Sequence, residues 1–219
     1  MTMTDFDHDL KVALAAVRKA ARATRLVQAG QLGQGTLVKD DRSPVTVADF
    51  AAQALVAQTL AEHCPDDPLV GEEDAQELRT GEHAGLRDRV VDIAAHAMGR
   101  ETLDPAELLD WIDRGGADGD SGRYWVLDPI DGTKGFLRGG QYAIALGLVE
   151  EGRVVAGVLG CPNYTPKDAA TPGLLLFARR GVGAFELPMD EERLDKASQV
   201  RVTATQDPAA WRFCESVES

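Results

Sequence analysis

The sequence predicts an α+β domain in which N-terminal helices pack on a largely antiparallel sheet. Segments with helical periodicity fill most of the first half, and short apolar segments separated by turn residues fill most of the second. A Rossmann fold would alternate strands and helices along the whole chain. The glycines of DPIDGTKG, residues 128–135, also match neither GxGxxG nor GxxxxGK[ST], so they do not indicate a P-loop.

Composition argues against several functional classes, among them membrane, secreted and nucleic-acid-binding proteins. The 219 residues suffice for one domain with a real core, and no apolar run reaches the roughly 20 residues that a membrane span requires. The N-terminus lacks the basic start and apolar block of a secretory signal, so we expect a cytoplasmic protein without membrane contact. The net charge of −13 disfavours nucleic-acid binding. Three scattered cysteines, Cys64, Cys161 and Cys214, predict buried reduced thiols and no zinc site, and nothing indicates an oligomeric state.

Two long helices are expected first. Residues 5–30 repeat apolar side chains at helical spacing and meet a glycine-rich stretch that begins at Gly30. A second helix is expected after Thr46, which we interpret as its N-cap, and it should end before Pro65. Asp49 would then lie in the first turn, where the helix dipole favours a negative charge.

The middle of the chain leads from a short strand to a longer one. PLVGEED, residues 68–74, is expected to form a short strand and an acidic loop, and helices are expected near 85–98 and 104–112. YWVLDPID, residues 124–131, reads as a strand that ends at two acids.

Hairpins are expected to complete the sheet. Residues 141–162 predict two strands joined by a turn at Glu151-Gly152, and residues 173–187 predict another hairpin that turns around Gly181. VRVTAT, residues 200–205, is expected to be a last strand, followed by a short helical start in DPAAWRFC.

Carboxylates lie at the ends of several of these elements. Asp49 begins a helix, Glu72 and Glu73 follow one strand, and Asp128 and Asp131 end another. Each acid alone is more often a turn, loop or helix-start residue, but together they could converge. Mg²⁺ prefers oxygen ligands, and two such ions about 3.5–4 Å apart can clamp a phosphate and activate water. The acids therefore predict a magnesium site.

The DPIDGT segment is interpreted as the centre of that site. Asp128 could bridge two metals, Pro129 would fix a turn, and the Ile130 carbonyl would be a neutral ligand. Gly132 would allow close backbone approach, and the Thr133 hydroxyl could pass a proton or orient a water. Backbone N–H groups of Gly132 and Thr133 could hold phosphate oxygens, especially if a short helix starts there.

Three motifs in order carry a family resemblance. SPVTVADFAAQ, LVGEED and WVLDPIDGTKGFLRGGQYAIALGLV closely resemble the lithium-sensitive, magnesium-dependent phosphatase superfamily that includes inositol monophosphatase. GTKGFLRGGQYA is similar to the 3′(2′),5′-bisphosphate nucleotidase branch, whereas inositol monophosphatases usually carry a GTTNF-like continuation. The resemblance implies a sugar-phosphatase fold and hydrolysis of 3′-phosphoadenosine 5′-phosphate to AMP and phosphate, in sulfur assimilation or nucleotide salvage. The 5′-phosphosulfate form is a second substrate that it suggests.

The resemblance also implies residue roles. It implies two or three Mg²⁺ ions held by Glu72, Asp128, the Ile130 carbonyl and Asp131. Asp49 and Thr133 match the pair that activates the attacking water, and Glu73 matches an acid that orients a metal-bound water.

The chain departs from the superfamily near its end. Superfamily members continue into a second α/β layer with a metal-binding aspartate in a WDxAAG-like motif, and this sequence contains no such motif. We therefore expect residues 1–219 to form a single N-terminal catalytic domain without the second layer, as a piece of a longer protein or a naturally short one. An inositol polyphosphate or monophosphate phosphatase is one alternative. An inactive metal-binding remnant, marked by an exposed apolar surface, is the other.

Overall fold

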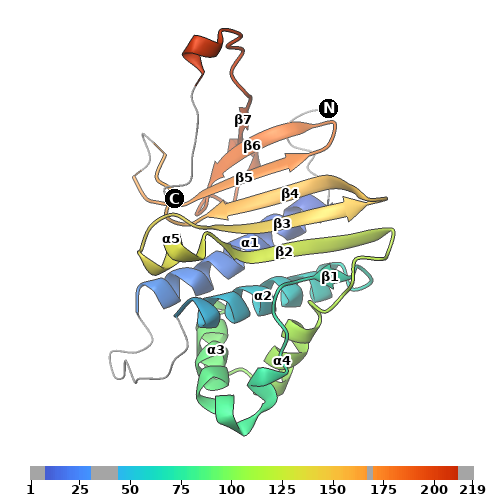
Figure 1. The fold of residues 1–219 in the computed structure, drawn as a ribbon, viewed down its shortest axis with the longest axis vertical. Helices are drawn as coiled ribbons and strands as arrows, with labels where there is room; N and C mark the ends of the chain where they lie inside the picture. The colour runs from blue at the N-terminus through green and yellow to red at the C-terminus, as the bar shows by residue number, and fades with distance from the viewer. Residues whose placement is uncertain (1–7, 31–43, 167–169, 212–219) are drawn as a thin grey trace.

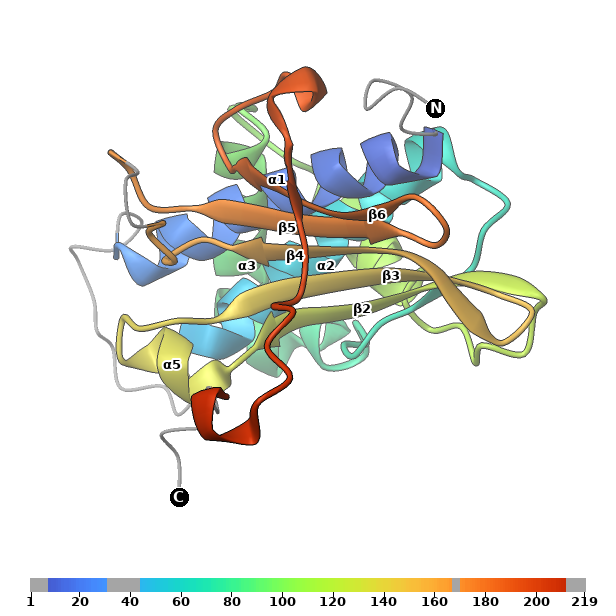
Figure 2. The same ribbon diagram turned by 90° about the horizontal axis from the view of Figure 1, so that it is seen from above.

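Helices cover one face of a seven-stranded sheet, as Figures 1 and 2 show. The computed structural model describes residues 8–30, 44–166 and 170–211. The strands are neighbours in the order of the sequence, β1 to β7, and all pairs are antiparallel except β1 with β2. The predicted class, helices on a largely antiparallel sheet, is confirmed.

The strands follow one another with few interruptions. They are β1 (Leu69–Val70), β2 (Arg123–Asp131), β3 (Ala143–Glu150), β4 (Arg153–Cys161), β5 (Leu174–Arg179), β6 (Gly183–Pro188) and β7 (Ser198–Val200). Both predicted hairpins are present. Glu151 and Gly152 have φ values of 48° and 68°, the left-handed conformation that a tight two-residue turn between twisted strands requires.

The helices lie mainly before the long strands. They are α1 (His8–Gln28), α2 (Pro44–His63), α3 (Ala84–Ala97), α4 (Pro105–Asp113) and α5 (Thr133–Leu137). Short 3₁₀ turns occur at Glu77–Arg79, Gly81–His83, Leu194–Lys196 and Pro208–Ala210. Within the described ranges, every helix is too short or too polar to cross a bilayer.

Helix α1 packs against β4 at a glycine. Leu10, Leu14 and Val17 are at most 1% exposed and form one apolar face. A Cβ placed on Gly160 would lie 2.4 Å from a methyl carbon of Val17. Only a residue without a side chain fits at this contact, so Gly160 sets the distance between the two layers.

Helix α2 is buried on nearly all sides, which explains its apolar sequence. Figure 1 shows it between α1 and the sheet on one side and α3 with α4 on the other. Val56 and Leu60 contribute to the core beneath the sheet, whereas Phe50 and Leu55 belong to a second core with α3 and α4. A helix that is apolar all round is the expected solution for such a central position.

The start of α2 differs from the prediction. The helix begins at Pro44, so Thr46 lies inside the first turn and is not the N-cap. Asp49 consequently lies in the second turn rather than the first, where the helix dipole has largely fallen off. Proline is favoured at the first helical position because its missing N–H would have no partner there, and this preference decides the boundary.

Two strand predictions are also corrected. Pro129 does not form a turn: β2 continues to Asp131 with a register shift against β3 between Asp128 and Asp131. Such an irregularity accommodates a residue that cannot donate to the ladder. The last strand ends at Val200 rather than at residue 205, and the helical start beyond it is a single 3₁₀ turn whose cap is Asp207. Cys64 is buried, as expected, whereas Cys161 is only partly buried; both are free thiols, and Cys214 lies outside the described residues.

The sheet face opposite the helices is bare and apolar. Val126, Val154 and Leu159 on this face are 39–61% exposed. Together with neighbouring apolar residues from β3 to β7 they line a hollow of about 680 Å³. Among the described lining residues, Asp128 is the one that carries a charge. The hollow therefore reaches the acidic end of β2.

Candidate active site

The acidic residues lie where β2 ends beside α2 and the loop after β1. Because β1 and β2 are parallel and Val70 pairs with Val126, Glu72 and Asp128 each follow that pair by two residues. Both acids therefore lie at the same end of the sheet. Ala48 of α2 and Ile130 of β2 belong to one small apolar cluster, and Asp49 follows Ala48 directly in the chain.

Asp49 is the most perturbed acid of the group. It is half-buried, and burial raises the pKa of its carboxyl to about 8. The negative charges of Glu73, Glu72 and Asp128 add to this shift, in that order. The pKa of Asp49 is therefore coupled to the charges of the three other predicted acids.

Glu73 and Asp128 experience the same two effects. Burial raises the pKa of Glu73 to about 7, and the charge of Glu72 contributes next. Burial and the charges of Glu72 and Asp131 raise the pKa of Asp128, although the N–H of Ile130 counteracts the shift by donating to Asp128 Oδ1 at 3.1 Å. Acids whose pKa values are raised by burial and by one another's charges are typical of functional sites.

The segment after β2 turns sharply into the short helix α5, which is the condition named above for phosphate binding by backbone N–H groups. Gly132 has a φ of 95°, a conformation that L side chains rarely adopt, and it precedes the short helix that begins at Thr133. The Thr133 side chain is exposed, and its hydroxyl donates to the carbonyl of Ile130 at 3.5 Å, a long hydrogen bond. The Thr133 hydroxyl, which the family resemblance pairs with Asp49, is thus directed to a backbone carbonyl of its own segment.

Polar side chains fasten α5 from outside. Gln28 at the end of α1 donates to the carbonyl of Phe136 at 2.9 Å and accepts from Asn163 at 2.8 Å. Asn163 also donates to the carbonyl of Gly140 at 2.6 Å. A Cβ on Gly135 would lie 1.9 Å from the carbonyl oxygen of Gln141, so the GTKGFLRGGQ segment folds tightly on itself only because glycine is present there.

The donor atoms suit a hard divalent cation. Carboxylates and a backbone carbonyl are the oxygen ligands that Mg²⁺ prefers. Burial is the main cause of the raised pKa values of Asp49, Glu73 and Asp128, and a cation would relieve the mutual repulsion that adds to it. Across the described ranges, no three His, Cys, Asp or Glu side chains lie close enough together to hold a metal ion. The acids share one electrostatic field, and Glu72, whose side chain is exposed, has freedom to turn toward the others.

One residue of this region was missed by the sequence analysis. Gln53, one turn after Asp49 on α2, is completely buried and hydrogen-bonded to the backbone of Glu72 and Glu73. A signal was present, because a glutamine in the apolar run VADFAAQALVAQ requires a partner when it is buried. Gln58 gives the same signal, so the sequence alone could not distinguish the two.

A family model decides the classification. The model described as "Inositol monophosphatase family" matches residues 2–209. The chain belongs to the inositol monophosphatase family. Proteins of this family are metal-dependent, typically with Mg²⁺, which agrees with the oxygen-rich donor set. The predicted resemblance is therefore confirmed.

Comparison with curated proteins shows which members of the family the chain resembles. The chain is 39% identical over 98% of its length to a 3′(2′),5′-bisphosphate nucleotidase of Schizosaccharomyces pombe, of which it spans 65%. It is 40% identical to the protein of that name from Emericella nidulans, over 98% of this chain and 67% of the relative. A 3′(2′),5′-bisphosphate nucleotidase 1 of Arabidopsis thaliana is 39% identical, over 97% and 65%. The chain thus spans about two thirds of these relatives.

Solved structures support the fold. CysQ from Bacteroides thetaiotaomicron, described as a bacterial member of the inositol monophosphatase family, matches with a TM-score of 0.51 and 19% identity, over 92% of this chain and 60% of that one. Mycobacterium tuberculosis SuhB matches with a TM-score of 0.51 and 24% identity, over 90% and 52%. At these identities the likeness concerns the fold alone.

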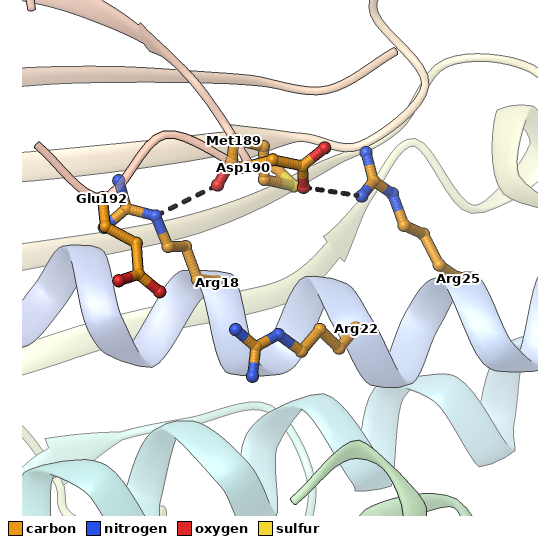
Figure 3. Close-up of a pocket in the computed structure, with 6 residues that line it drawn as sticks. All are labelled: Arg18, Arg22, Arg25, Met189, Asp190 and Glu192. Carbon is orange, nitrogen blue, oxygen red and sulfur yellow. Dashed lines mark hydrogen bonds and ion pairs between the residues drawn. The ribbon is translucent and has the colours of Figure 1, made fainter. Parts of the chain in front are cut away.

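A second cavity, of about 210 Å³, lies between α1 and the segment after β6. Figure 3 shows three arginines of α1 beside Met189, Asp190 and Glu192. Two of the guanidinium groups have partners: Arg18 donates to the carbonyl of Met189 at 3.1 Å, and Arg25 forms an ion pair with Asp190 at 3.7 Å. These contacts attach α1 to the sheet, so we assign the cavity a structural role.

Proposed function

We propose that the chain forms the N-terminal catalytic domain of a metal-dependent phosphatase that removes the 3′-phosphate of 3′-phosphoadenosine 5′-phosphate. The products are AMP and phosphate, and the 5′-phosphosulfate form is a second substrate. The similarity to curated bisphosphate nucleotidases, 39–40% over nearly the whole chain, carries this proposal. The grouped acids at the end of β2 support a phosphatase site.

The oxygen atoms around the end of β2 would hold two or three Mg²⁺ ions. The assigned ligands are the carboxylates of Glu72, Asp128 and Asp131 and the carbonyl of Ile130. When bound, Mg²⁺ would stabilise negative charge on the phosphate and leaving oxygens. Glu73, partly buried beside Glu72, would orient a water at the site through its carboxylate.

Asp49 and Thr133 would move the proton of the attacking water. Asp49 would be favoured in its ionised form by the positive charge of bound Mg²⁺. The Thr133 hydroxyl then takes the proton of the water while it gives its own to the Asp49 carboxylate, so the pair acts as a general base. For this relay the Thr133 side chain must leave its long hydrogen bond to Ile130 and turn toward Asp49. The partly buried position of Asp49 keeps competing water away from the carboxylate.

The remaining groups would position the phosphate. The exposed turn at Gly132 and Thr133 presents backbone N–H groups that can bind phosphate oxygens. The oxygen of the attacking water bonds to phosphorus as the bond from phosphorus to the 3′-oxygen breaks. The departing 3′-oxygen then takes a proton from a second water, and the hydroxide that this leaves takes the proton held by Asp49. This restores the base and completes the hydrolysis without a covalent enzyme intermediate.

Phosphate release tests the proposal directly. The 219-residue chain is incubated in Mg²⁺ with 3′-phosphoadenosine 5′-phosphate or inositol 1-phosphate, each with and without lithium. We expect release from the nucleotide that depends on Mg²⁺ and falls with lithium. Release from inositol 1-phosphate alone would contradict the substrate and favour an inositol phosphatase.

The bare apolar face of the sheet supports one competing hypothesis, an inactive metal-binding remnant. A folded chain that binds Mg²⁺ but releases phosphate from neither substrate would establish that hypothesis and refute the first. Circular dichroism on the same sample confirms that the chain is folded.

A further inference from the structure

Gln53 holds the acidic loop by a fully used side-chain amide. Its Oε1 accepts from the backbone N–H groups of Glu72 at 3.0 Å and Glu73 at 2.9 Å. Its Nε2 donates to the carbonyls of Glu73 at 2.6 Å and Ile112 at 3.0 Å. A glutamine amide has two donor hydrogens and one acceptor oxygen with two lone pairs, so all four are engaged.

The chain around this amide is shaped to admit it. A Cβ on Gly71 would lie 2.4 Å from Gln53 Oε1, and a Cβ on Gly115 would lie 2.4 Å from its Nε2. The two glycines are themselves linked, because the N–H of Gly71 donates to the carbonyl of Gly115 at 2.8 Å. The buried amide therefore occupies a slot that larger residues on either side would close.

The far end of the acidic loop has a separate anchor. Asp113, at the end of α4, accepts from the N–H of Ala75 at 3.0 Å and pairs with Arg79 at 2.5 Å. Gln53 is thus the contact that fixes the part of the loop that carries Glu72 and Glu73. It does so from the helix that also carries Asp49, four residues earlier and on the same helical face.

We propose that Gln53 is a positioning residue of the candidate active site. It fixes the backbone of Glu72 and Glu73 relative to Asp49, so that metal binding and turnover depend on an amide that touches neither metal nor substrate. The inference rests on the proposed function for its activity readout, but the loop geometry and the metal readout stand without it. Residues that orient metal ligands typically change metal affinity or activity by about 10- to 100-fold when they are replaced.

The test compares two methionine variants of the same helix. Gln53→Met removes the amide and keeps a similar side-chain volume. Gln58→Met is the matched control, because Gln58 is 3% exposed on α2 and its Oε1 accepts from Lys19 at 2.6 Å, away from the acidic loop. Three quantities are measured: amide hydrogen exchange at residues 72 and 73, the Mg²⁺ concentration that gives half of the thermal stabilisation, and kcat and KM for 3′-phosphoadenosine 5′-phosphate.

The expected pattern is specific to positioning. In Gln53→Met the amides of Glu72 and Glu73 exchange faster, the half-saturating Mg²⁺ concentration rises about tenfold or more, and kcat falls more than KM rises. Gln58→Met matches the wild type within about twofold in all three. Equal exchange rates and equal Mg²⁺ dependence in the two variants would overturn the proposal, even if both were destabilised.

A replacement variant and a wild-type control allow the inference to be tested even if Gln53→Met does not fold. If Gln53→Met does not fold, Gly115→Ala takes its place, because the added Cβ would displace Nε2 without removing the amide. In the wild type without Mg²⁺, the amides of Glu72 and Glu73 must also be protected from hydrogen exchange. Rapid exchange at both would refute the proposal. A wild-type chain that releases no phosphate refutes the proposed function alone, since exchange and Mg²⁺ binding still report on Gln53.

Discussion

Replacing Asp49 with asparagine should stabilise the metal-free protein at neutral pH while it abolishes activity. Asparagine has nearly the same shape as aspartate but carries no charge. In the folded chain burial and three neighbouring acids raise the pKa of Asp49 from 3.8 to about 8. Between these values the folded state holds a proton that the unfolded state has released. The stability contributed by Asp49 is therefore complete below about pH 4 and is lost as pH rises through 8.

The size of the effect follows from the shift. One pKa unit corresponds to about 1.4 kcal/mol, so ionisation at pH 7 would cost about 4 kcal/mol if the group were sealed from water. The side chain is only partly buried, and solvent screening reduces this to about 1–2 kcal/mol. Asp49→Asn should gain that amount at pH 7 to 8 and nothing near pH 4.

Urea unfolding at pH 5 and pH 8 in EDTA measures the pH dependence of stability, and the same experiment in Mg²⁺ measures the effect of a bound cation. In EDTA the wild type should lose free energy of unfolding between the two pH values more steeply than Asp49→Asn. In Mg²⁺ the wild type should recover this loss, because a bound cation offsets the repulsion. A variant that is less stable than the wild type at pH 8 in EDTA would refute the reasoning, because it would mean that the ionised carboxylate is stabilising.

Three further predictions concern chemistry and packing. Asp128→Asn should lower phosphate release about 10³-fold at saturating Mg²⁺, which corresponds to about 4 kcal/mol of lost transition-state stabilisation; near-normal turnover would contradict the ligand assignment. Thr133→Ala should lower kcat about 10²-fold or more, whereas Thr133→Ser keeps the hydroxyl and should stay within a few-fold; equal loss in both would exclude a proton-transfer role. Gly160→Ala should destabilise the fold by about 1–3 kcal/mol in urea unfolding because its Cβ would lie 2.4 Å from Val17, while Gly157→Ala, whose nearest neighbour is 3.8 Å away, should be nearly neutral; equal midpoints would contradict the close approach of α1.

Local patterns predicted the elements that local chemistry determines. The face of α1 and the hairpin at Glu151-Gly152 follow from apolar periodicity and turn residues, and both agree with the structure. The predicted start of α2 was wrong. Thr46 and Pro44 are each favourable near the start of a helix, and the sequence alone does not show which of them begins it. The extent of β2 agrees with the prediction, but the turn expected at Pro129 is absent, because the register shift that accommodates this proline depends on β3.

The acids of the site could be predicted, but their arrangement could not. Their position at the ends of apolar segments is visible in the sequence, whereas the pairing of β1 with β2 joins residues more than 50 positions apart. The role of Gln53 depends on the same long-range packing, because its partners belong to the loop after β1 and to α4. A pattern confined to one helix contains no information about these partners.

The unbroken order of the strands has a consequence for synthesis on the ribosome. Each hairpin can close as soon as its second strand has emerged, without waiting for distant sequence. Helix α1 is different, because Val17 packs under Gly160, more than 140 residues later. At translation rates of about 5–20 residues per second, the ribosome needs roughly 7 s or longer to reach Gly160 after it has added Val17. Its contact with α2 can form much sooner, so we expect α2 to cover part of the apolar surface of α1 before the sheet has been synthesised.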